Sequence, residues 1–310
     1  MKITTITLSP AIDVHCYVPE LVPAREHLAG VTSRDVGGKG INISRALTAN
    51  HIPNIAFVVL GDETASTFSD HLSAEGIAHR DFVTCGRVRE NITIHTDDGK
   101  ETRISFSDSL GTAEIWKEIE SSLLFSAEED SIVTITGRVP DGIPLAIIKD
   151  TVRKLRAVGV KVVIDSRSFT KNDLIECKPW LIKPNQEEIG QYTGKQIMTL
   201  DEAISVAREF HRLGIDNMML TLGTQGAVLA CESGCFAAVP PTVSAISTVG
   251  AGDSTIARFL AGAVQRLSPH ECLSLAVAYG TASCLTRGTR APLPETITKI
   301  HSEVKLKSFL

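Results

Sequence analysis

No pair of cysteines in this sequence has the Cys-x-x-Cys spacing, and the number of cysteines, seven, is odd. The two closest, Cys231 and Cys235, have no histidine at the spacing of a metal ligand. A structural zinc site is therefore not expected. The pattern favours reduced, buried thiols in a cytoplasmic protein.

Long apolar runs are also missing. The N-terminal MKITTITLSP alternates threonine with isoleucine as a strand does, so it lacks the apolar core of a signal peptide. No stretch approaches the roughly 18 uninterrupted apolar residues of a membrane span. We therefore expect a soluble protein in the cytoplasm, with no membrane partner.

An excess of basic charge is absent too. The formal net charge is −5, and lysine and arginine are scattered along the chain, which argues against nucleic acid as the main partner. Apolar residues make up 43% of the chain and charged residues 22%, so it can bury a core and shows no sign of disorder. Its 310 residues fit one large domain, or a main domain with a small appendage.

Short β-branched runs alternate with helical patterns along the chain. This alternation predicts an α/β fold, in which βαβ units build a parallel sheet covered by helices on both faces. The expected helices include residues 41–49, 145–157 and 200–213. The expected strands are residues 2–8, 55–60, 132–136, 162–165, 180–183 and 218–222.

Two regions interrupt this alternation. Residues 12–35 and 87–107 have extended, polar-alternating patterns without helices, and the second contains the turn signal Asp97-Asp98-Gly99. We interpret them as strands of a small separate sheet, inserted at about 12–35 and 87–107 into a single α/β domain that spans residues 1–310. Such a sheet suits a lid over an active site. A surface for homodimerisation is the rival role, and one sheet can serve both.

Gly37-Gly38-Lys39-Gly40-Ile41-Asn42 is the first of three glycine clusters that can approach an anion. It opens a helix but fails the Walker A pattern, which needs glycine where Ser33 stands and Ser or Thr where Gly40 stands. Glycines let the backbone come close to a ligand, which Lys39 and Asn42 can reach. A tight turn with a solvated lysine explains these residues equally well.

The second cluster is Gly250-Ala251-Gly252-Asp253, and it stands at the start of a helical pattern. Free N–H groups and the helix dipole favour a negative charge at such a position. Asp253 is therefore either a helix cap or a functional carboxylate. Capping does not explain why the residues before Asp253 are Gly-Ala-Gly, whose small side chains leave the backbone N–H groups open to a ligand.

Two further segments also have both a structural and a functional interpretation. Residues 222–226, with Gly223 and Gly226, form a turn between two predicted strands, and a nucleotide phosphate site is the alternative. Asn185 and Glu188 lie one turn apart at the start of a predicted helix. Their oxygens suit Mg²⁺, which takes few protein ligands, and they suit an N-terminal helix cap equally well.

Together these four motifs resemble one family, the ribokinase-type (phosphofructokinase-B) carbohydrate kinases. Residues 37–42 and 247–253 look like its two signatures, Asn185-Gln-Glu-Glu188 matches its Asn-x-x-Glu motif, and residues 222–226 match its nucleotide loop. The resemblance covers nearly the whole chain. It implies a ribokinase-like parallel sheet with a mixed edge, helices on both faces and a small β-sheet lid.

Within the family the sequence is most similar to the 1-phosphofructokinase and tagatose-6-phosphate kinase branch. Leu8-Ser-Pro-Ala-Ile-Asp13 is close to that branch's Leu-Asn-Pro-Ala-Ile-Asp. Three residues depart from the branch on the expected sugar side. Ser9 replaces the usual Asn, Arg138 replaces Ser, and Asp108 replaces a common Gly. These departures bear on the identity of the substrate rather than on the fold or the reaction.

The resemblance implies an ATP-dependent kinase that phosphorylates a hydroxyl of a phosphosugar, with fructose 1-phosphate as the expected substrate. Asp253 would be the base, and the N–H groups of Gly250, Ala251 and Gly252 would stabilise the transferring phosphoryl group. The expected substrate-binding residues are Asp13, Gly38, Lys39, Asn42, Arg89, Arg103 and Arg138. ATP would lie along Lys183, Asn185, Thr221, Gly223 and Gly226, with Mg²⁺ near Glu188.

The cationic residues of this set favour a substrate that already carries a phosphate. If residues 87–107 form a hairpin, Arg89 and Arg103 both lie at its end away from the turn and can act as one clamp. Tagatose-6-phosphate kinase and 6-phosphofructokinase activities are alternatives within the family. A nucleoside or vitamin kinase and a non-catalytic sugar-phosphate sensor are alternatives of other classes.

Overall fold

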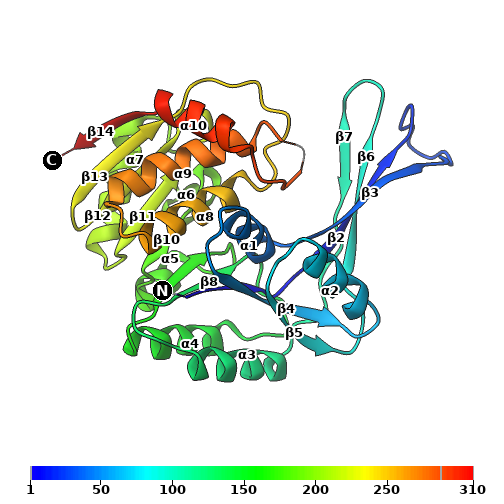
Figure 1. Cartoon of the computed structure of the whole chain (residues 1–310), viewed down its shortest axis with the longest axis horizontal. Helices are drawn as coiled ribbons and strands as arrows, with labels where there is room; N and C mark the ends of the chain where they lie inside the picture. The colour runs from blue at the N-terminus through cyan, green and yellow to red at the C-terminus, as the bar shows by residue number, and fades with distance from the viewer. Residues whose placement is uncertain (1, 287, 310) are drawn as a thin grey trace.

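A twisted sheet of ten strands forms the centre of the computed structural model, which describes residues 2–286 and 288–309 (Figure 1). The strand order is β14-β13-β12-β11-β10-β9-β8-β1-β4-β5. These strands are β1 (Ile3–Thr7), β4 (Asn54–Gly61), β5 (His79–Thr84), β8 (Ile132–Thr136), β9 (Lys161–Asp165), β10 (Leu181–Ile182), β11 (Asn217–Thr221), β12 (Ala227–Cys231), β13 (Gly234–Val239) and β14 (Lys305–Phe309).

The sheet is parallel from β5 to β11 and antiparallel from β11 to β14. This confirms the predicted α/β class and the mixed edge. All six predicted strands are present, although the run at 180–183 forms only the two-residue strand β10. The helices are α1 (Lys39–Ala49), α2 (Ala65–Ala74), α3 (Ala113–Phe125), α4 (Leu145–Ala157), α5 (Lys171–Cys177), α6 (Gln186–Thr193), α7 (Leu200–Arg212), α8 (Ala251–Val264), α9 (Pro269–Ser283) and α10 (Pro294–Glu303).

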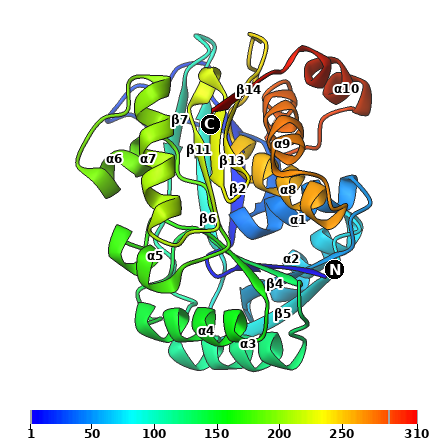
Figure 2. The same ribbon diagram turned by 90° about the vertical axis from the view of Figure 1, so that its left-hand side faces the viewer.

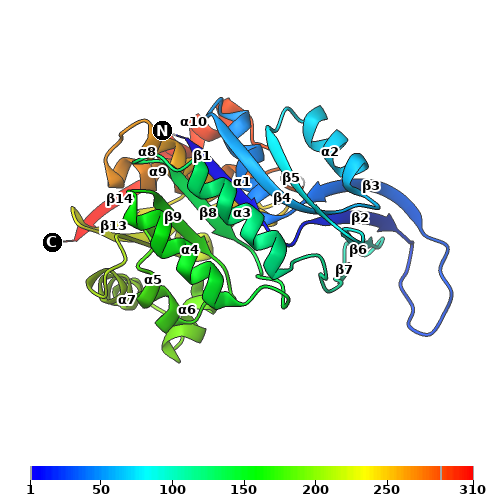
Figure 3. The same ribbon diagram turned by 90° about the horizontal axis from the view of Figure 1, so that it is seen from below.

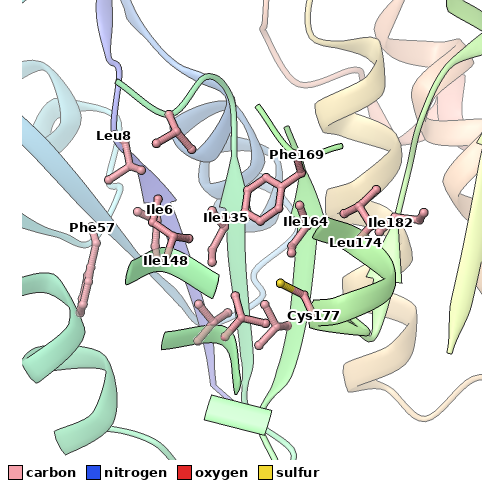
Figure 4. Packing of buried hydrophobic residues seen from close by; sticks show 14 of the residues in the cluster. Ile6, Leu8, Phe57, Ile135, Ile148, Ile164, Phe169, Leu174, Cys177 and Ile182 are labelled. Atoms are coloured by element: carbon pink, nitrogen blue, oxygen red, sulfur yellow. The ribbon is translucent and has the colours of Figure 1, made fainter. Parts of the chain in front are cut away.

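Successive side chains of a strand point to opposite faces of the sheet, and helices cover both faces, so the side chains on both sides are buried. In β9, Val162 and Ile164 belong to one cluster of buried residues and Val163 belongs to another. The first cluster also contains residues of α2, α3, α4, α5 and α7, and Figure 4 shows part of it between the strands and the helices. The second contains residues of α1, α8 and α9. The helices therefore lie in two layers, as Figures 2 and 3 show from two further directions.

A second sheet, of four strands, projects from one end of this body (Figure 1). Its strands are β2 (Ala11–Tyr17), β3 (Gly30–Gly37), β6 (Arg89–His95) and β7 (Glu101–Ile104), in the order β3-β2-β6-β7. β2 and β3 follow β1 directly and lead into α1, whereas β6 and β7 lie between β5 and α3. The predicted turn before β7 is present, with Gly99 at a φ of +75°. We call these four strands the small sheet.

The two faces of the small sheet differ in chemistry. Strand register places Asp13 beside Asn91, and His15 beside Thr93, which itself lies beside Arg103, so these side chains share a polar face. The other face carries apolar residues, namely Val14, Cys16, Val31, Ile92, Ile94 and Ile104.

All seven cysteines lie in the described residues and none forms a disulfide. Five of them are buried, as expected. The prediction of burial is wrong for Cys85, which is exposed because it lies in the bend after β5 rather than inside a strand. Among the described residues, no helix is long and apolar enough to cross a membrane.

Candidate active site

Polar residues gather at the edge of the main sheet where its parallel strands end, which is the usual place for a site in open α/β sheets. Asp165 is the last residue of β9, and Lys183 follows β10 directly. The loop after β8 lies against the same point, because Gly137 N donates to Asp165 O at 3.0 Å. Helices α1 and α8 begin at this edge with Lys39 and Ala251.

Asp253 is buried in the first turn of α8, and Gly250 is the N-cap residue of that helix. The Asp253 side chain faces α1, where Asn42 Nδ2 donates to Asp253 Oδ2 at 2.8 Å. Burial raises the pKa of the Asp253 carboxyl to about 6, although the Lys39 charge and the hydrogen bond from Asn42 act in the opposite direction. A cap on α8 is therefore not what holds this carboxylate in place.

The Asp165 carboxylate lies between two lysines of the predicted set. Lys39 Nζ is 2.9 Å from Asp165 Oδ2, and Lys183 Nζ is 3.6 Å from Asp165 Oδ1. Burial opposes the charged form of Asp165, but Lys183 and Lys39 outweigh it and lower the pKa of the carboxyl. Burial would also lower the pKa of Lys39, and the charges of Asp165 and Asp253 raise it instead. Both groups are therefore charged at neutral pH.

The small residues before Asp253 leave no room for side chains. A Cβ at Gly252 would lie 3.1 Å from Lys183 Nζ, and one at Gly250 would lie 2.9 Å from Thr289 Cγ2. The Lys183 ammonium is thus next to the backbone at the start of α8, where the helix dipole is positive. Ala251 N donates to Thr248 O at 3.3 Å. The Ala251 N–H group, one of the three predicted donors to the phosphoryl group, therefore already has a partner within the chain.

Gly38, Lys39 and Asn42 lie together at the start of α1. Gly38 has a φ of +144°, which strains any other residue, and a Cβ there would come within 2.4 Å of Thr7 Cγ2. This glycine therefore lets α1 begin against the end of β1. The structure brings Lys39 and Asn42 to Asp253 and does not leave Lys39 as a solvated lysine.

On the small sheet, Asp13 is the acceptor for two side chains. Arg103 Nη2 and Asn91 Nδ2 donate to Asp13 Oδ1 at 2.8 and 2.9 Å. Arg89 lies farther toward the main body and donates to Phe106 O at 2.8 Å and to Pro10 O at 3.4 Å. The two arginines lie toward the open end of the β6–β7 hairpin, with their side chains held by different partners.

The three departures from the branch pattern have different surroundings. Arg138 is exposed and pairs with Asp141, 2.9 Å away, in the loop after β8. Ser9 Oγ and Asp108 Oδ2 are buried and, in the described part of the chain, have no hydrogen-bond partner. Arg89 contacts both Pro10 and Phe106, so the segments that carry Ser9 and Asp108 lie close to each other.

On the side where the nucleotide was expected, Asn185 and Glu188 form the predicted helix cap. Asn185 Oδ1 accepts from Glu188 N at 2.8 Å, and Glu188 Oε2 accepts from Asn185 N at 3.0 Å. Glu188 Oε1 accepts from Arg167 Nε at 3.0 Å. Thr221 forms a bridge with Asn185, and its hydroxyl donates to Pro184 O at 3.3 Å.

The loop with Gly223 and Gly226 is a 3₁₀ turn (Gly223–Gln225) between the antiparallel strands β11 and β12, as the structural interpretation predicts. Gly226 has a φ of +89°, and a Cβ there would lie 1.9 Å from Ala238 O. Its identity is therefore explained by packing. The exposed Gly223 has open space around it, so this end of the loop is accessible to a ligand.

Mg²⁺ was expected near Glu188. Within residues 2–286 and 288–309, no three His, Cys, Asp or Glu side chains are grouped to hold a metal. Mg²⁺ commonly binds through one or two carboxylates, water and substrate phosphates. The buried Glu188 carboxylate keeps a second lone pair on each oxygen, so it fits a magnesium ion held mainly by water and phosphate.

Three residues of the site were not predicted from the sequence, namely Asp165, Arg45 and Arg167. Asp165 ends the apolar run Val162-Val163-Ile164, and a carboxylate at the end of a buried strand is a signal that could have identified it. Arg45 Nη1 donates to Asn42 Oδ1 at 3.0 Å, and Arg45 follows Asn42 by three positions in α1, which places both side chains on one helix face. No sequence signal distinguishes Arg167 from other arginines.

Comparison with known proteins supports the fold and the reaction class. Residues 3–296 match the pfkB family carbohydrate kinases. The chain is 31% identical over 277 residues to a 1-phosphofructokinase of Escherichia coli, covering 89% of each chain. It is 28% identical over 306 residues to a 1-phosphofructokinase of Bacillus subtilis, covering 98% of this chain and 99% of the other. The structure of Escherichia coli phosphofructokinase-2 in complex with potassium superposes with a TM-score of 0.89, at 25% identity and over 97% and 98% of the two chains. The resemblance inferred from the motifs is thus confirmed, and the chain belongs to the pfkB family of carbohydrate kinases, the ATP-dependent sugar phosphotransferases.

Proposed function

We propose that this chain transfers the γ-phosphate of ATP to fructose 1-phosphate and forms fructose 1,6-bisphosphate. The relatives named 1-phosphofructokinase support this substrate, since they align over most of the chain. One structural observation carries the proposal. Asp253 is a buried carboxylate with a pKa of about 6, at a helix N-terminus and beside two lysines. A sugar kinase needs a base and an anion site side by side in this way.

Asp253 accepts the proton of the attacking sugar hydroxyl. Its Oδ2 receives the hydrogen bond from Asn42, so Oδ1 is the atom that takes the proton. A base with a pKa of about 6 is ionised at neutral pH and still basic enough to help the hydroxyl react.

The transferring phosphoryl group lies at the start of α8, where Gly252 N–H and the Lys183 ammonium stabilise its charge. Gly250 and Ala251 contribute their N–H groups once the turn at Thr248 gives up its bond to Ala251. Asp165 holds Lys183 and Lys39 near each other, so that Lys183 serves the nucleotide and Lys39 the sugar.

The sugar phosphate binds between α1 and the polar face of the small sheet. Arg103 and Arg89 contact the phosphate that the substrate already carries, and Asp13 holds sugar hydroxyls. Lys39, Asn42 and Gly38 border the other side of the sugar. Arg138 follows Gly137, where a Cβ would lie 4.0 Å from Lys39 Cβ, and it adds a phosphate contact. Ser9 Oγ and Asp108 Oδ2 are shielded from solvent and lack partners in the described structure, so sugar hydroxyls satisfy them only if the segments that carry these residues move apart.

ATP lies along Lys183, Asn185, Thr221 and the loop from Gly223 to Gly226. Glu188 is the carboxylate that would hold Mg²⁺, mainly through water, and the ion would neutralise charge on the phosphates. Arg167 shares the Glu188 carboxylate and limits how far its side chain can turn. Closure of the small sheet over the sugar excludes water and so limits hydrolysis of ATP.

The test is to measure ADP and fructose 1,6-bisphosphate formed from ATP and fructose 1-phosphate. Formation of both products in equal amounts, abolished by Asp253→Asn, supports the proposal. ADP release that does not depend on a sugar phosphate contradicts it.

We also propose that the small sheet joins two copies of the chain, and that the enzyme works in the cytoplasm. The exposed apolar residues Val31 and Ile104 lie on one face of this sheet, and a partner copy would bury them. Ile104→Lys should convert a dimer to a monomer in light scattering. A wild-type chain that is monomeric at assay concentration rules out the dimer.

A further inference from the structure

Arg45 in α1 is mostly buried, and its side chain reaches four different segments. Nη1 donates to Asn42 Oδ1 at 3.0 Å and to Thr289 Oγ1 at 2.9 Å. Nη2 donates to Val36 O at 2.8 Å and to Glu75 Oε1 at 3.1 Å. Arg45 therefore connects α1 and α2 with the end of β3 and with the loop that packs on Gly250.

The bond to Asn42 fixes which way the Asn42 amide points. An arginine side chain has only donors, so it can bind the oxygen of an amide and never the NH₂ group. Since Arg45 holds Asn42 Oδ1, Asn42 Nδ2 must face the other way, and it is this group that donates to Asp253 Oδ2 at 2.8 Å. Glu75, Arg45, Asn42 and Asp253 thus form one chain of contacts.

The orientation of the Asn42 amide matters because Asn42 can present either its NH₂ group or its carbonyl oxygen to a carboxyl group. The NH₂ group stabilises the ionised carboxylate, whereas the carbonyl oxygen binds only a protonated carboxyl. An Asn42 free to turn over would therefore favour protonated Asp253, which cannot act as a base.

We propose that Arg45 is a positioning residue for phosphoryl transfer, which holds the Asn42 amide in the one orientation that keeps Asp253 ionised. This inference rests on the proposed role of Asp253 as the base. Among the described residues Arg45 has no hydrogen bond to Asp253 itself, so its effect must pass through Asn42.

The other charged groups that act on Asp253 are Lys39, Asp165 and Lys183. None of them is bonded to Arg45 in the described structure. A substitution at Arg45 therefore leaves the charges of Lys39, Asp165 and Lys183 in place. Arg45→Lys, which keeps the positive charge at position 45, separates the loss of that charge from the release of Asn42. This separates a change in base strength from a general loss of the site's electrostatics.

Arg45 also has a structural role, since its ion pair with Glu75 joins α1 to α2. Glu75→Gln is the matched control, because it removes the charge of this pair and keeps an acceptor for Arg45. In this variant Arg45 keeps its bonds to Asn42, Thr289 and Val36. We expect its kinetics to be those of the wild type.

The experiment is the pH profile of kcat for the wild type, Arg45→Met and Glu75→Gln, with saturating ATP and phosphosugar. For Arg45→Met we expect roughly a 3-fold loss of kcat at pH 6.5 that disappears by about pH 8.5, because the acidic pKa of the profile rises by about one unit from about 6. Arg45→Lys keeps the charge without the two-pronged geometry and should show the same direction of shift, so it serves if Arg45→Met does not fold.

A second set tests the route through Asn42. In an Asn42→Ala background, Arg45→Met should cost no further kcat, because the two residues act in series. Equal losses at every pH, or the same losses in Glu75→Gln, would overturn the inference and reduce Arg45 to a structural residue. Asp253→Asn separates the two proposals. If it is inactive while Arg45→Met has the wild-type profile, Asp253 remains the base and only the role of Arg45 is wrong.

Discussion

Asp165 Oδ2 lies 2.9 Å from Lys39 Nζ, and these two residues are 126 positions apart in the sequence. The other oxygen of the same buried carboxylate faces Lys183 at 3.6 Å. One carboxylate therefore holds the lysine assigned to the sugar and the lysine assigned to ATP. It also adds to the raised pKa of Asp253.

Asp165→Asn should destabilise the protein, because it removes the buried carboxylate that pairs with both Lys39 and Lys183. Breaking a buried ion pair from one side costs about 3–5 kcal/mol, whereas an exposed pair contributes about 0–1 kcal/mol. Urea unfolding of Asp165→Asn should therefore show a large loss in the free energy of unfolding. Asp150→Asn, which removes a carboxylate paired with the half-exposed Arg153 and Lys154, is the control. Equal losses in the two variants would mean that the Asp165 pairs contribute little.

The pH dependence of kcat should report Asp253. Its pKa is raised to about 6 by burial, and a base must be ionised to work, so kcat should fall as pH decreases through about 6 and stay level above about 7. Asp253→Asn should lower kcat by at least ~10²-fold and leave the KM for ATP nearly unchanged. A folded Asp253→Asn enzyme with wild-type turnover would remove Asp253 from the mechanism.

Much of the fold and part of the site could be predicted from the sequence because the signals are local. A helix start is marked by Gly38 or by Gly250, and strands are marked by β-branched runs. The contacts of Asp165 and Arg45 could not be predicted in this way. Both depend on how distant segments meet at the sheet edge, as when Arg45 reaches Thr289, 244 positions away. The helix cap at Asn185 is by itself enough to explain the presence of Glu188 in the sequence. A second, metal-binding role of Glu188 could therefore not be predicted from the sequence pattern.

Glu188→Gln tests that second role. Glutamine can keep the capping contacts, so the fold of α6 should survive, but a neutral side chain holds Mg²⁺ less well. We expect the Mg²⁺ concentration for half-maximal rate to rise several-fold while kcat at saturating Mg²⁺ changes less. An unchanged Mg²⁺ titration would leave Glu188 as a helix-cap residue only.

Arg103→Met should weaken the use of the phosphosugar. Losing one charge-assisted hydrogen bond of about 1.5–3 kcal/mol corresponds to roughly a 10- to 150-fold loss in kcat/KM, with the KM for ATP nearly constant. Arg34 is a matched control, since it lies on the same sheet in an exposed pair with Glu90. Arg34→Met should behave as the wild type. Equal effects of the two substitutions would contradict a phosphate contact at Arg103.

The role of Arg138 is tested by Arg138→Ser, which restores the residue usual in the branch. The substitution removes a side chain that pairs with Asp141 and is otherwise exposed. A higher KM for the phosphosugar supports a phosphate contact, which is what we expect. New activity on a phosphosugar that the wild type rejects would show instead that Arg138 narrows the site.

The most direct measurement is kcat/KM for a panel of acceptors at saturating ATP and Mg²⁺. The panel contains fructose 1-phosphate, fructose 6-phosphate, tagatose 6-phosphate, free fructose and a nucleoside. Because Arg89, Arg103 and Lys39 favour an acceptor that carries a phosphate, we predict that fructose 1-phosphate has the highest kcat/KM. Free fructose should fall below it by at least the roughly 10-fold that one lost charged contact costs. A higher kcat/KM for free fructose or the nucleoside than for every phosphosugar would contradict the proposed function.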